Sequence, residues 1–321
     1  MEATLAAWLA AAEGPDEEFV DRAWRLVLRR EPDAESRDRA LSKLADGTLS
    51  RATLLRELVS DTEFARVAMF DDGVAFARGA RARGERPRGL TAPAGTDERA
   101  IEVPWCLARA GGQRVLDVGY AFAEPAYLAG LVGLGVELTG VDLAQAEVPG
   151  MRSVLGDVRA LPFDDRSFDF ALCISTLEHI GRDNELYGLA TEPDEQGAER
   201  ALAELRRVLV PDGRLVVSVP CGEEQDLGWQ VQRPPAGWVS LFEGAGFVVF
   251  EDEVYELGDE GWRSTASFVP EGVRYGERGP GASAVLCAEL RPRRISELVR
   301  LAVRDVRHRD EPRRSTRGDG Q

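Results

Sequence analysis

Apolar residues recur at helical spacing through residues 15–70. In FVDRAWRLVLRR, which begins at Phe19, and in RATLLRELV, which begins at Arg51, an apolar residue returns every three or four positions. This spacing gathers the apolar side chains on one face of a helix. Short polar side chains cap the free N–H groups at helix starts, and glycine ends helices. The residues expected at these ends are Asp16, Asp33 or Ser36, Gly47 and Ser50. The pattern predicts a small all-α domain of three or four short helices.

Residues 71–96 have a different composition. They read DDGVAFARGARARGERPRGLTAPAGT and are rich in arginine, glycine and proline. Their apolar residues show little periodicity, which is typical of a linker or a mobile segment. We therefore expect the helical domain to end at residue 70 and a second domain to begin at residue 97.

Continuous apolar runs appear beyond residue 97. These runs end near Asp117, Asp142, Asp157 and Ile174, and turn-forming residues follow them. Such runs are typical of strands that are buried on both faces of a parallel sheet, with helices in the connections. Ligands of these sheets bind at the carboxyl ends of the strands. The pattern therefore predicts an α/β domain with a ligand site at one sheet edge.

The turn after the first strand is the most informative segment. It reads VLDVGYAFAEP (115–125) and leads into a helix at Pro125. Free backbone N–H groups at a helix start hold carboxylates or phosphates. Dinucleotide enzymes carry GxGxxG at this place, whereas this chain has Ala121 and Ala123, with Asp117 two residues before the first glycine. Asp117 argues against a pyrophosphate, so a nicotinamide-dependent reductase is the weaker alternative.

Length and charge narrow the classes of function. The 321 residues suit two domains, and 56 acidic against 40 basic residues give a formal charge of −16. Nonspecific binding to nucleic acid needs a basic surface, so no nucleic-acid partner is expected. The four cysteines are scattered without CxxC spacing, so we expect reduced thiols in a cytoplasmic protein and no metal site. Neither a transmembrane segment nor a signal peptide is predicted.

With this order of strands and acids, the chain from Thr96 to Pro292 resembles the class I S-adenosylmethionine (SAM) methyltransferases. ALAELRRVLVPDGRLVVSVPCG (201–222) is similar to the family's helix, turn and fifth strand, and GASAVLCAELRP is similar to part of its final hairpin. The resemblance implies a Rossmann-like sheet of seven strands with helices on both faces, and SAM as the cofactor. The expected parts are a helical module (1–70), a linker (71–96), the methyltransferase domain (97–292), and an amphipathic helix with a charged tail (293–321).

The resemblance also implies which residues bind SAM. Asp117 and the glycine turn would take the methionine part, and Asp142 would take both ribose hydroxyls as paired hydrogen bonds. Asp157 would recognise the adenine amino group, and its alternative role is to cap the following turn. The stretch after Asp142 is too short for a full crossover helix, which would leave the adenine pocket partly open. The full expected set is Asp117, Gly119, Tyr120, Ala121, Asp142, Leu143, Asp157, Val158 and Ser175.

The acceptor side is expected near ISTLEHIGRDNELYG (174–188), which follows the fourth strand. His179 is the only histidine outside the charged tail, so it is the candidate base for a hydroxyl or amine acceptor. The alternative is that His179 only braces a helix start. Aromatic and polar side chains on long loops suit a sugar ring, or else they anchor those loops. The substrate candidates are Glu178, Asn184, Tyr187, Trp229, Trp262 and Arg263.

The N-terminal segment carries a second resemblance. FVDRAWRLVLRREPDAES, with Gly47 and SDTEF (60–64), resembles a small helical domain of unassigned function found in bacterial surface proteins and beside glycosyltransferases. This implies a glycan-related acceptor and a protein partner for residues 15–70. We therefore expect SAM-dependent O-methylation of a glycan or small metabolite. The alternative is a noncatalytic scaffold with a methyltransferase fold that acts through the helical module.

Overall fold

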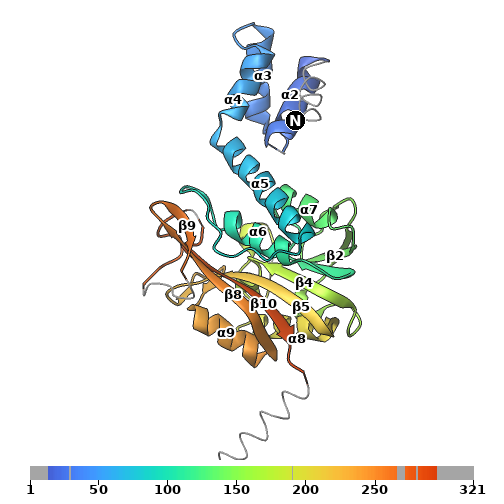
Figure 1. Ribbon diagram of the computed structural model, residues 1–321. Coiled ribbons are helices and arrows are strands. Elements are labelled where there is room, and N and C mark those ends of the chain that lie inside the picture. The colour runs from blue at the N-terminus through green and yellow to red at the C-terminus, as the bar shows by residue number, and fades with distance from the viewer. Residues whose placement is uncertain (1–13, 29, 190, 266–271, 280, 295–321) are drawn as a thin grey trace, which may run out of the picture.

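The computed structural model describes residues 14–28, 30–189, 191–265, 272–279 and 281–294. A group of helices at the N-terminus lies above an α/β domain (Figure 1). Apart from residues 293 and 294, the amphipathic helix and charged tail predicted over 293–321 lie outside the described residues. Within the described part of the chain, every helix is too short or too polar to cross a bilayer.

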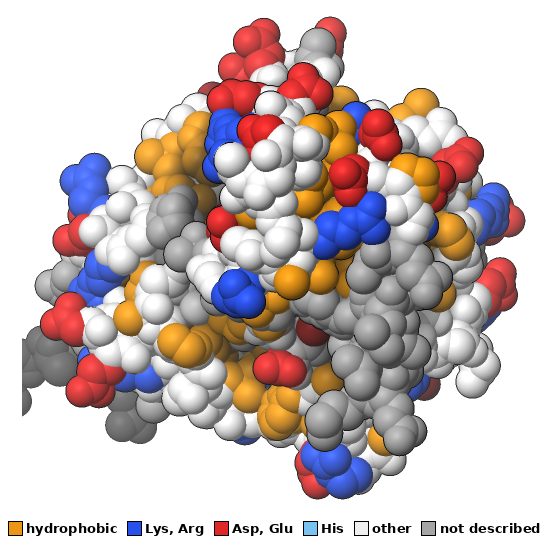
Figure 2. Space-filling view, turned by 90° about the horizontal axis from the view of Figure 1, so that it is seen from above, with side chains coloured by type: hydrophobic (Ala, Val, Ile, Leu, Met, Phe, Trp, Pro, Cys, Tyr) orange, Lys and Arg blue, Asp and Glu red, His pale blue; other side chains and the backbone are white. Residues whose placement is uncertain are grey.

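The described part of the chain starts with three short helices: α2 (Asp16–Leu28), α3 (Ala34–Ala45) and α4 (Arg51–Val59). Asp33 accepts a hydrogen bond from the backbone N–H of Ser36 at 2.8 Å, and Ser50 accepts one from Thr53 at 3.1 Å. These contacts confirm both predicted caps. The apolar faces of the three helices meet in one core that includes Phe19. Seen from above, acidic and basic side chains are interspersed on this face of the molecule (Figure 2).

Helix α5 (Thr62–Ala82) connects this group to the α/β domain. Residues 71–82, which the sequence places in a linker, are therefore helical. The buried residues Phe70, Val74, Ala77 and Ala80 follow one another at helical spacing. Two of these four residues are alanines, and the residues around them are largely arginine and glycine. The helical repeat of apolar residues is therefore weak in the sequence. Val74 packs so closely on the next domain that a Cβ atom at Gly130 would lie 2.9 Å from its side chain.

Eight strands form one sheet in the order β3-β2-β1-β4-β5-β10-β8-β9. Their bounds are β1 (Arg114–Val118), β2 (Glu137–Asp142), β3 (Arg152–Leu155), β4 (Phe168–Ile174), β5 (Leu209–Pro220), β8 (Phe247–Gly258), β9 (Gly261–Ser264) and β10 (Ala284–Pro292). Strands β1 to β5 are parallel, and β10 is antiparallel to both β5 and β8. A separate short pair consists of β6 (Gln225–Asp226) and β7 (Val231–Gln232). The parallel half puts the carboxyl ends of β1, β2 and β4 at one edge.

The expected number of seven strands is wrong by one. The additional strand is β9, which returns along the end of β8 and pairs with it as a hairpin. The sequence pattern assigns residues 258–281 to a loop because β9 is only four residues long. A Cβ atom at Gly261 would lie 2.1 Å from the Ala92 carbonyl oxygen, so glycine allows this strand to lie against the chain at Ala92.

Helices cover both faces of the sheet, as predicted. Helices α6 (Arg99–Arg109) and α7 (Pro125–Val132) pack on one face, with α5 lying over them. Helices α8 (Gly197–Val208) and α9 (Pro235–Gly244) pack on the other face (Figure 1). Two large apolar clusters, one on each face, form the core. The connection from β2 to β3 contains no helix, which confirms that it is too short for a crossover helix. Three single 3₁₀ turns also occur: η1 (Val158–Ala160), η2 (Leu177–His179) and η3 (Glu185–Tyr187).

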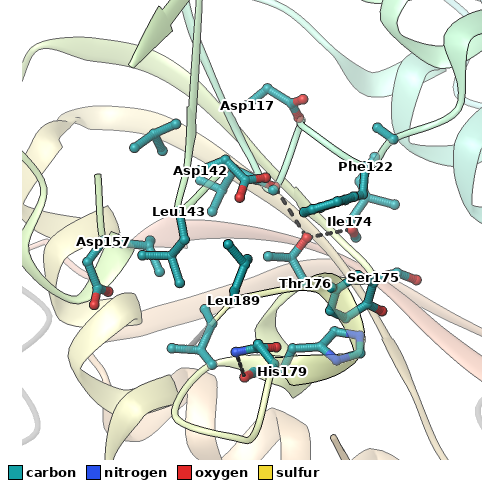
Figure 3. Close-up of a pocket in the computed structure, with 18 of the residues that line it drawn as sticks. Asp117, Phe122, Asp142, Leu143, Asp157, Ile174, Ser175, Thr176, His179 and Leu189 are labelled. Atoms are coloured by element: carbon teal, nitrogen blue, oxygen red, sulfur yellow. Dashed lines mark hydrogen bonds between the residues drawn. The ribbon is translucent and has the colours of Figure 1, made fainter. Parts of the chain in front are cut away.

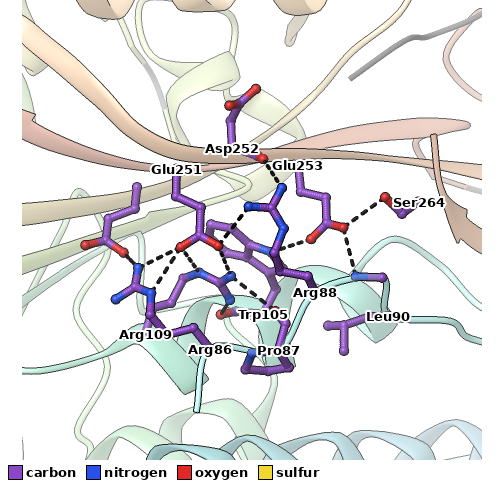
Figure 4. Close-up of polar contacts among 12 residues, drawn as sticks. Arg86, Pro87, Arg88, Leu90, Trp105, Arg109, Glu251, Asp252, Glu253 and Ser264 are labelled. Atoms are coloured by element: carbon purple, nitrogen blue, oxygen red, sulfur yellow. Dashed lines mark hydrogen bonds and ion pairs between the residues drawn. The ribbon is translucent and has the colours of Figure 1, made fainter. Parts of the chain in front are cut away.

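The segment between α5 and α6 is held against β8 by arginine–carboxylate contacts (Figure 4). Arg86, Arg88 and Arg109 contact Glu251 at 2.9, 3.2 and 2.8 Å. Arg109 also lies over the ring of Trp105, 3.5 Å from its centroid. These contacts fix the path of the chain into α6, whose first residues line the cavities described below.

Candidate functional site

The turn after β1 is closely packed against the end of β4. Gly119 has φ +84°, and a Cβ atom there would lie 2.3 Å from Thr176 Oγ1. The Thr176 hydroxyl lies 2.8 Å from the Ile174 carbonyl oxygen and 3.3 Å from that of Val118, so it links the ends of the two strands (Figure 3). Ser175, next to it, also has a positive φ of 43°. Glycine is therefore required at 119 both by its backbone conformation and by the space available.

Asp117 is buried at the end of β1 with an incomplete set of hydrogen bonds. Its Oδ1 accepts a hydrogen bond from the Tyr127 hydroxyl at 2.6 Å, and its Oδ2 has no hydrogen-bond partner in the part of the chain that the structure describes. Burial raises the pKa of Asp117 to about 7, against the lowering effect of the Tyr127 hydrogen bond. Asp117 lines a cavity. Its Oδ2, which lacks a donor among the described residues, is therefore suited to accept a hydrogen bond from a ligand.

Asp142 at the end of β2 is held in place by the backbone. Its Oδ2 accepts a hydrogen bond from the Ala121 N–H, and its Oδ1 accepts one from the Ala144 N–H, each at 3.0 Å. Two donors fix the carboxylate while leaving lone pairs on both oxygens for a ligand. Asp157 is more fully engaged, since it caps η1 through the Arg159 N–H at 2.8 Å and contacts the Arg159 guanidinium at 2.7 Å. The capping role considered for Asp157 is thus confirmed.

These residues line a first cavity of about 180 Å³ at the carboxyl edge of the sheet (Figure 3). The predicted cofactor residues that it brings together are Asp117, Gly119, Asp142, Leu143, Asp157, Val158 and Ser175. Phe122, which is 55% exposed, and Tyr187 both line the cavity. Their ring centroids lie 5.2 Å apart, although the two residues come from segments far apart in the sequence. Ala123 also lines the cavity.

A second cavity of about 890 Å³ adjoins the first. Both cavities are lined by Arg99, Ser175, His179 and Tyr187. The predicted substrate residues that reach the second cavity are Glu178, Tyr187 and Trp229, whereas Asn184 lines only the first. The two cavities are therefore neighbours with four lining residues in common.

His179 lies where the two cavities meet. Its Nδ1 is 3.0 Å from the Trp229 carbonyl oxygen, which can only accept a hydrogen bond, so Nδ1 carries the proton in the neutral ring. Its Nε2 is 3.8 Å from Glu178 Oε1. Burial lowers the pKa of His179 to about 4. The imidazole is therefore neutral at neutral pH and has an unprotonated Nε2.

Four predicted residues line neither cavity: Trp262, Arg263, Tyr120 and Ala121, whose backbone N–H donates to Asp142. Trp262 is buried on β9, where its indole N–H donates to the Thr96 carbonyl oxygen at 3.0 Å, so it anchors the edge hairpin. Arg263 follows it on β9 and is exposed. The Tyr120 side chain is fully buried, and its hydroxyl exchanges hydrogen bonds with the backbone of Ala146 at 3.1 and 3.3 Å. The acceptor roles predicted for Trp262 and Arg263 are wrong, because strand pairing turns them away from the site.

The comparison with known proteins fits this geometry. Residues 116–217, which run from β1 into β5, match the family described as "Methyltransferase domain". This segment, about a third of the chain, therefore carries the likeness to methyltransferases. The family likeness thus covers the parallel half of the sheet and the first cavity except for its lining residues on α6.

Individual relatives resemble the methyltransferase domain over part of their length. The chain is 39% identical over 112 residues to the demethylmenaquinone methyltransferase of Renibacterium salmoninarum, which covers 33% of this chain and 41% of that protein. It is 30% identical over 136 residues to the O-methyltransferase cnsE of Penicillium expansum, with coverage of 38% and 43%. The chain spans about two fifths of the length of these curated relatives. Among solved structures, the 1,6-didemethyltoxoflavin-N1-methyltransferase of Burkholderia thailandensis, with bound S-adenosylhomocysteine, is 18% identical, with a TM-score of 0.41 over 71% of this chain and 85% of that one.

Several residues of the methyltransferase domain that line the site carry no clear signal in the sequence. Thr176 is one of them, since only its contact with Gly119 reveals why it is placed there. Glu102 is fully buried on α6 and accepts a hydrogen bond from the Ser175 hydroxyl at 2.7 Å. Burial raises the pKa of Glu102 to about 7. Arg99, one turn earlier on α6, borders both cavities. Glu102 itself is a candidate from the sequence, because DERAIEVPWCLARA (97–110) resembles the family helix that flanks the methionine end of SAM. Arg99 is linked to it only by helical spacing.

Proposed function

We propose that this chain transfers the methyl group of SAM to a hydroxyl group of a glycan unit or other small metabolite bound in the second cavity. The observation that supports the proposal is the pair of adjoining cavities with Arg99, Ser175, His179 and Tyr187 in common. Methyl transfer is an in-line displacement, so donor and acceptor must be held end to end at van der Waals distance. Two cavities with a shared boundary meet this requirement.

The first cavity has groups that match the polar parts of SAM. We assign the unpaired Asp117 Oδ2 to the ammonium of the methionine part, because a buried acceptor favours a charged donor. We assign the fixed carboxylate of Asp142 to the two ribose hydroxyls, with Leu143 beside it. Val158 and the backbone around Asp157 border the remaining end, which is left for adenine.

SAM, when bound, supplies a methyl group on a positively charged sulfur. In the proposed reaction the sulfur–carbon bond breaks as the oxygen–carbon bond forms, and the bonding electron pair stays on sulfur. The acceptor hydroxyl loses a proton, which we assign to His179 Nε2. Nδ1–H of His179 is fixed on the Trp229 carbonyl oxygen at 3.0 Å, so Nε2 is the nitrogen left with a lone pair. With its pKa near 4, His179 is in its basic form throughout the neutral range.

Calorimetric titration of the purified chain with SAM and with S-adenosylhomocysteine tests the donor site. Saturable heat with a stoichiometry of one is expected. Incubation with SAM and candidate glycans or metabolites, followed by mass spectrometry, should then reveal a product that has gained one methyl group. A folded chain without saturable heat for either compound would contradict the proposal and favour a noncatalytic scaffold.

A further inference from the structure

The second cavity is rich in carboxylates. Its charged lining consists of four acids and a single guanidinium: Glu63, Asp97, Glu98, Glu178 and Arg99. Several of the acids already have partners. Glu63 pairs with Arg30 at 2.6 Å, Asp97 lies 3.5 Å from the Arg99 guanidinium, and Glu98 accepts a hydrogen bond from the Ala282 N–H at 3.0 Å. Glu178 differs from these three.

Glu178 is a buried carboxyl group with one free oxygen. The residue is 3% exposed, and its Oε2 has no hydrogen-bond partner among the described residues. Its other oxygen, Oε1, lies 3.8 Å from His179 Nε2. Burial raises the pKa of Glu178 well above its ordinary value, with smaller contributions from Glu102 and Glu98. A buried acceptor of this kind is costly unless a ligand supplies a donor, and a cationic donor would favour its ionised form.

Aromatic rings line the same cavity beside Glu178. The rings of Tyr187, His179, Trp229 and Tyr275 follow one another, with centroid distances of 5.6, 5.3 and 5.7 Å between successive members. All four residues line the second cavity. The faces of tyrosine and tryptophan rings attract cations, and combined with a carboxylate they form the kind of site that binds ammonium groups.

An alternative use of these acids is to stabilise the positive sulfur of SAM. Glu98 and Glu178 line only the second cavity, however, whereas Asp117 and Asp142 line only the first. The unpaired Glu178 oxygen is thus on the acceptor side of the boundary residues. The placement favours a positive charge on the acceptor over a contact with the sulfonium.

We propose that the second cavity binds an acceptor that carries a protonated amine, which contacts Glu178 and the ring of Trp229. The inference rests on the proposed function, because it identifies the second cavity as the acceptor site. It narrows the substrate class to hydroxylated small molecules or sugar units with a free amino group. An N-acetylated sugar, whose nitrogen is neutral, belongs to the disfavoured class.

Cyclohexylamine and cyclohexanol are suitable probes, since they differ mainly in charge and are small enough for a cavity of about 890 Å³. Both are titrated by ligand-observed NMR into the full chain saturated with S-adenosylhomocysteine, at pH 7.5 and 150 mM salt to screen surface charge. We expect the amine to bind at least tenfold more tightly than the alcohol. Equal binding of the two, or tighter binding of the alcohol, would overturn the inference.

Variants locate the effect. Glu178→Gln, which keeps the shape of the side chain, should abolish the preference for the amine, and Trp229→Leu should reduce it several-fold. Glu195→Gln, at an exposed acid outside both cavities, is the matched control and should retain the preference. A preference that survives both Glu178→Gln and Trp229→Leu in folded protein would place the amine elsewhere and refute the site.

Binding of the cofactor separates this inference from the proposed function. Glu178→Gln should leave the ratio of the SAM and S-adenosylhomocysteine dissociation constants unchanged; a selective loss of SAM affinity would assign Glu178 to the sulfonium and overturn the inference alone. Absence of saturable S-adenosylhomocysteine binding to the wild-type chain would refute the proposed function, and the acceptor assignment with it.

Discussion

Protonation of Asp117 should control cofactor affinity between pH 5.5 and 7.5. The pKa of the buried carboxyl group is raised from 3.8 to about 7, so it is mostly neutral at pH 5.5 and mostly ionised at pH 7.5. If only the ionised form pairs with the ammonium of the cofactor, affinity must rise with pH. The ionised fraction increases about 25-fold over this interval for a single group with a pKa of 7. The affinity for S-adenosylhomocysteine should rise by nearly the same factor.

The assay is calorimetric titration of S-adenosylhomocysteine at half-unit pH steps, for the wild type and for Asp117→Asn. The asparagine variant should bind weakly and with little pH dependence. Glu102 must be controlled, because it borders the same cavity and its pKa is also raised to about 7. Glu102→Gln should therefore keep most of the slope. A flat wild-type profile, or a slope that persists in Asp117→Asn, would refute the pairing of Asp117 with the ammonium.

The same shift has a consequence for the unliganded protein. A carboxyl group whose pKa is higher in the folded state binds a proton that the unfolded chain releases. Its contribution to stability is complete below about pH 3.8 and is lost as the pH rises through about 7. Asp117→Asn should remove this loss, so the variant's melting temperature should fall less than that of the wild type between pH 5 and 8. Equal decreases would show that Asp117 does not carry the effect.

Other substitutions probe the remaining parts of the site. Asp142→Ala should weaken SAM binding by about 1.5–3 kcal/mol, the scale of hydrogen bonds to a charged group, and unchanged affinity by calorimetry would remove Asp142 from the cofactor site. His179→Gln should lower the rate of methyl transfer while leaving SAM binding nearly intact; an equal rate would return His179 to a structural role. Gly119→Ala should destabilise the fold by roughly 1–3 kcal/mol or more, because a Cβ atom would meet Thr176 Oγ1 at 2.3 Å in a strained backbone conformation. Gly84→Ala, which shares the positive φ but has open space around it, measures the backbone cost alone in the same thermal unfolding assay.

The convergence of Asp117, Asp142 and Asp157 on the first cavity could be predicted from the sequence because it follows from a local rule. Asp117, Asp142 and Asp157 each end a strand, and parallel strands bring such ends together at one edge. The first cavity collects all three. The caps of α3 and α4 were equally predictable, since a cap depends on residues only three positions apart.

Features that depend on long-range pairing could not be predicted. The segment around Trp262 has the composition expected of a binding loop. Trp262 forms an antiparallel bridge with Ala92, however, and is buried at the sheet edge. Thr176 has no signal of its own, because its position is set by Gly119 in the turn after β1. The C-terminal part of α5 was not predicted for a different reason. Much of its buried face is alanine, whose hydrophobicity differs little from that of the neighbouring residues.

Helix α5 belongs to two parts of the molecule at once. Its first turns, which include Glu63 and Met69, border the second cavity, and its later turns pack on α6 and α7. Deletion of residues 1–70 would cut this helix near its middle. It would also remove Glu63 and Met69 from the lining of the second cavity. If the second cavity binds the acceptor, as proposed, substitutions at Glu63 or Met69 would alter which acceptors fit while sparing the residues around Asp117 and Asp142. Selectivity for the acceptor can thus evolve, or be engineered, from a segment outside the family's shared core.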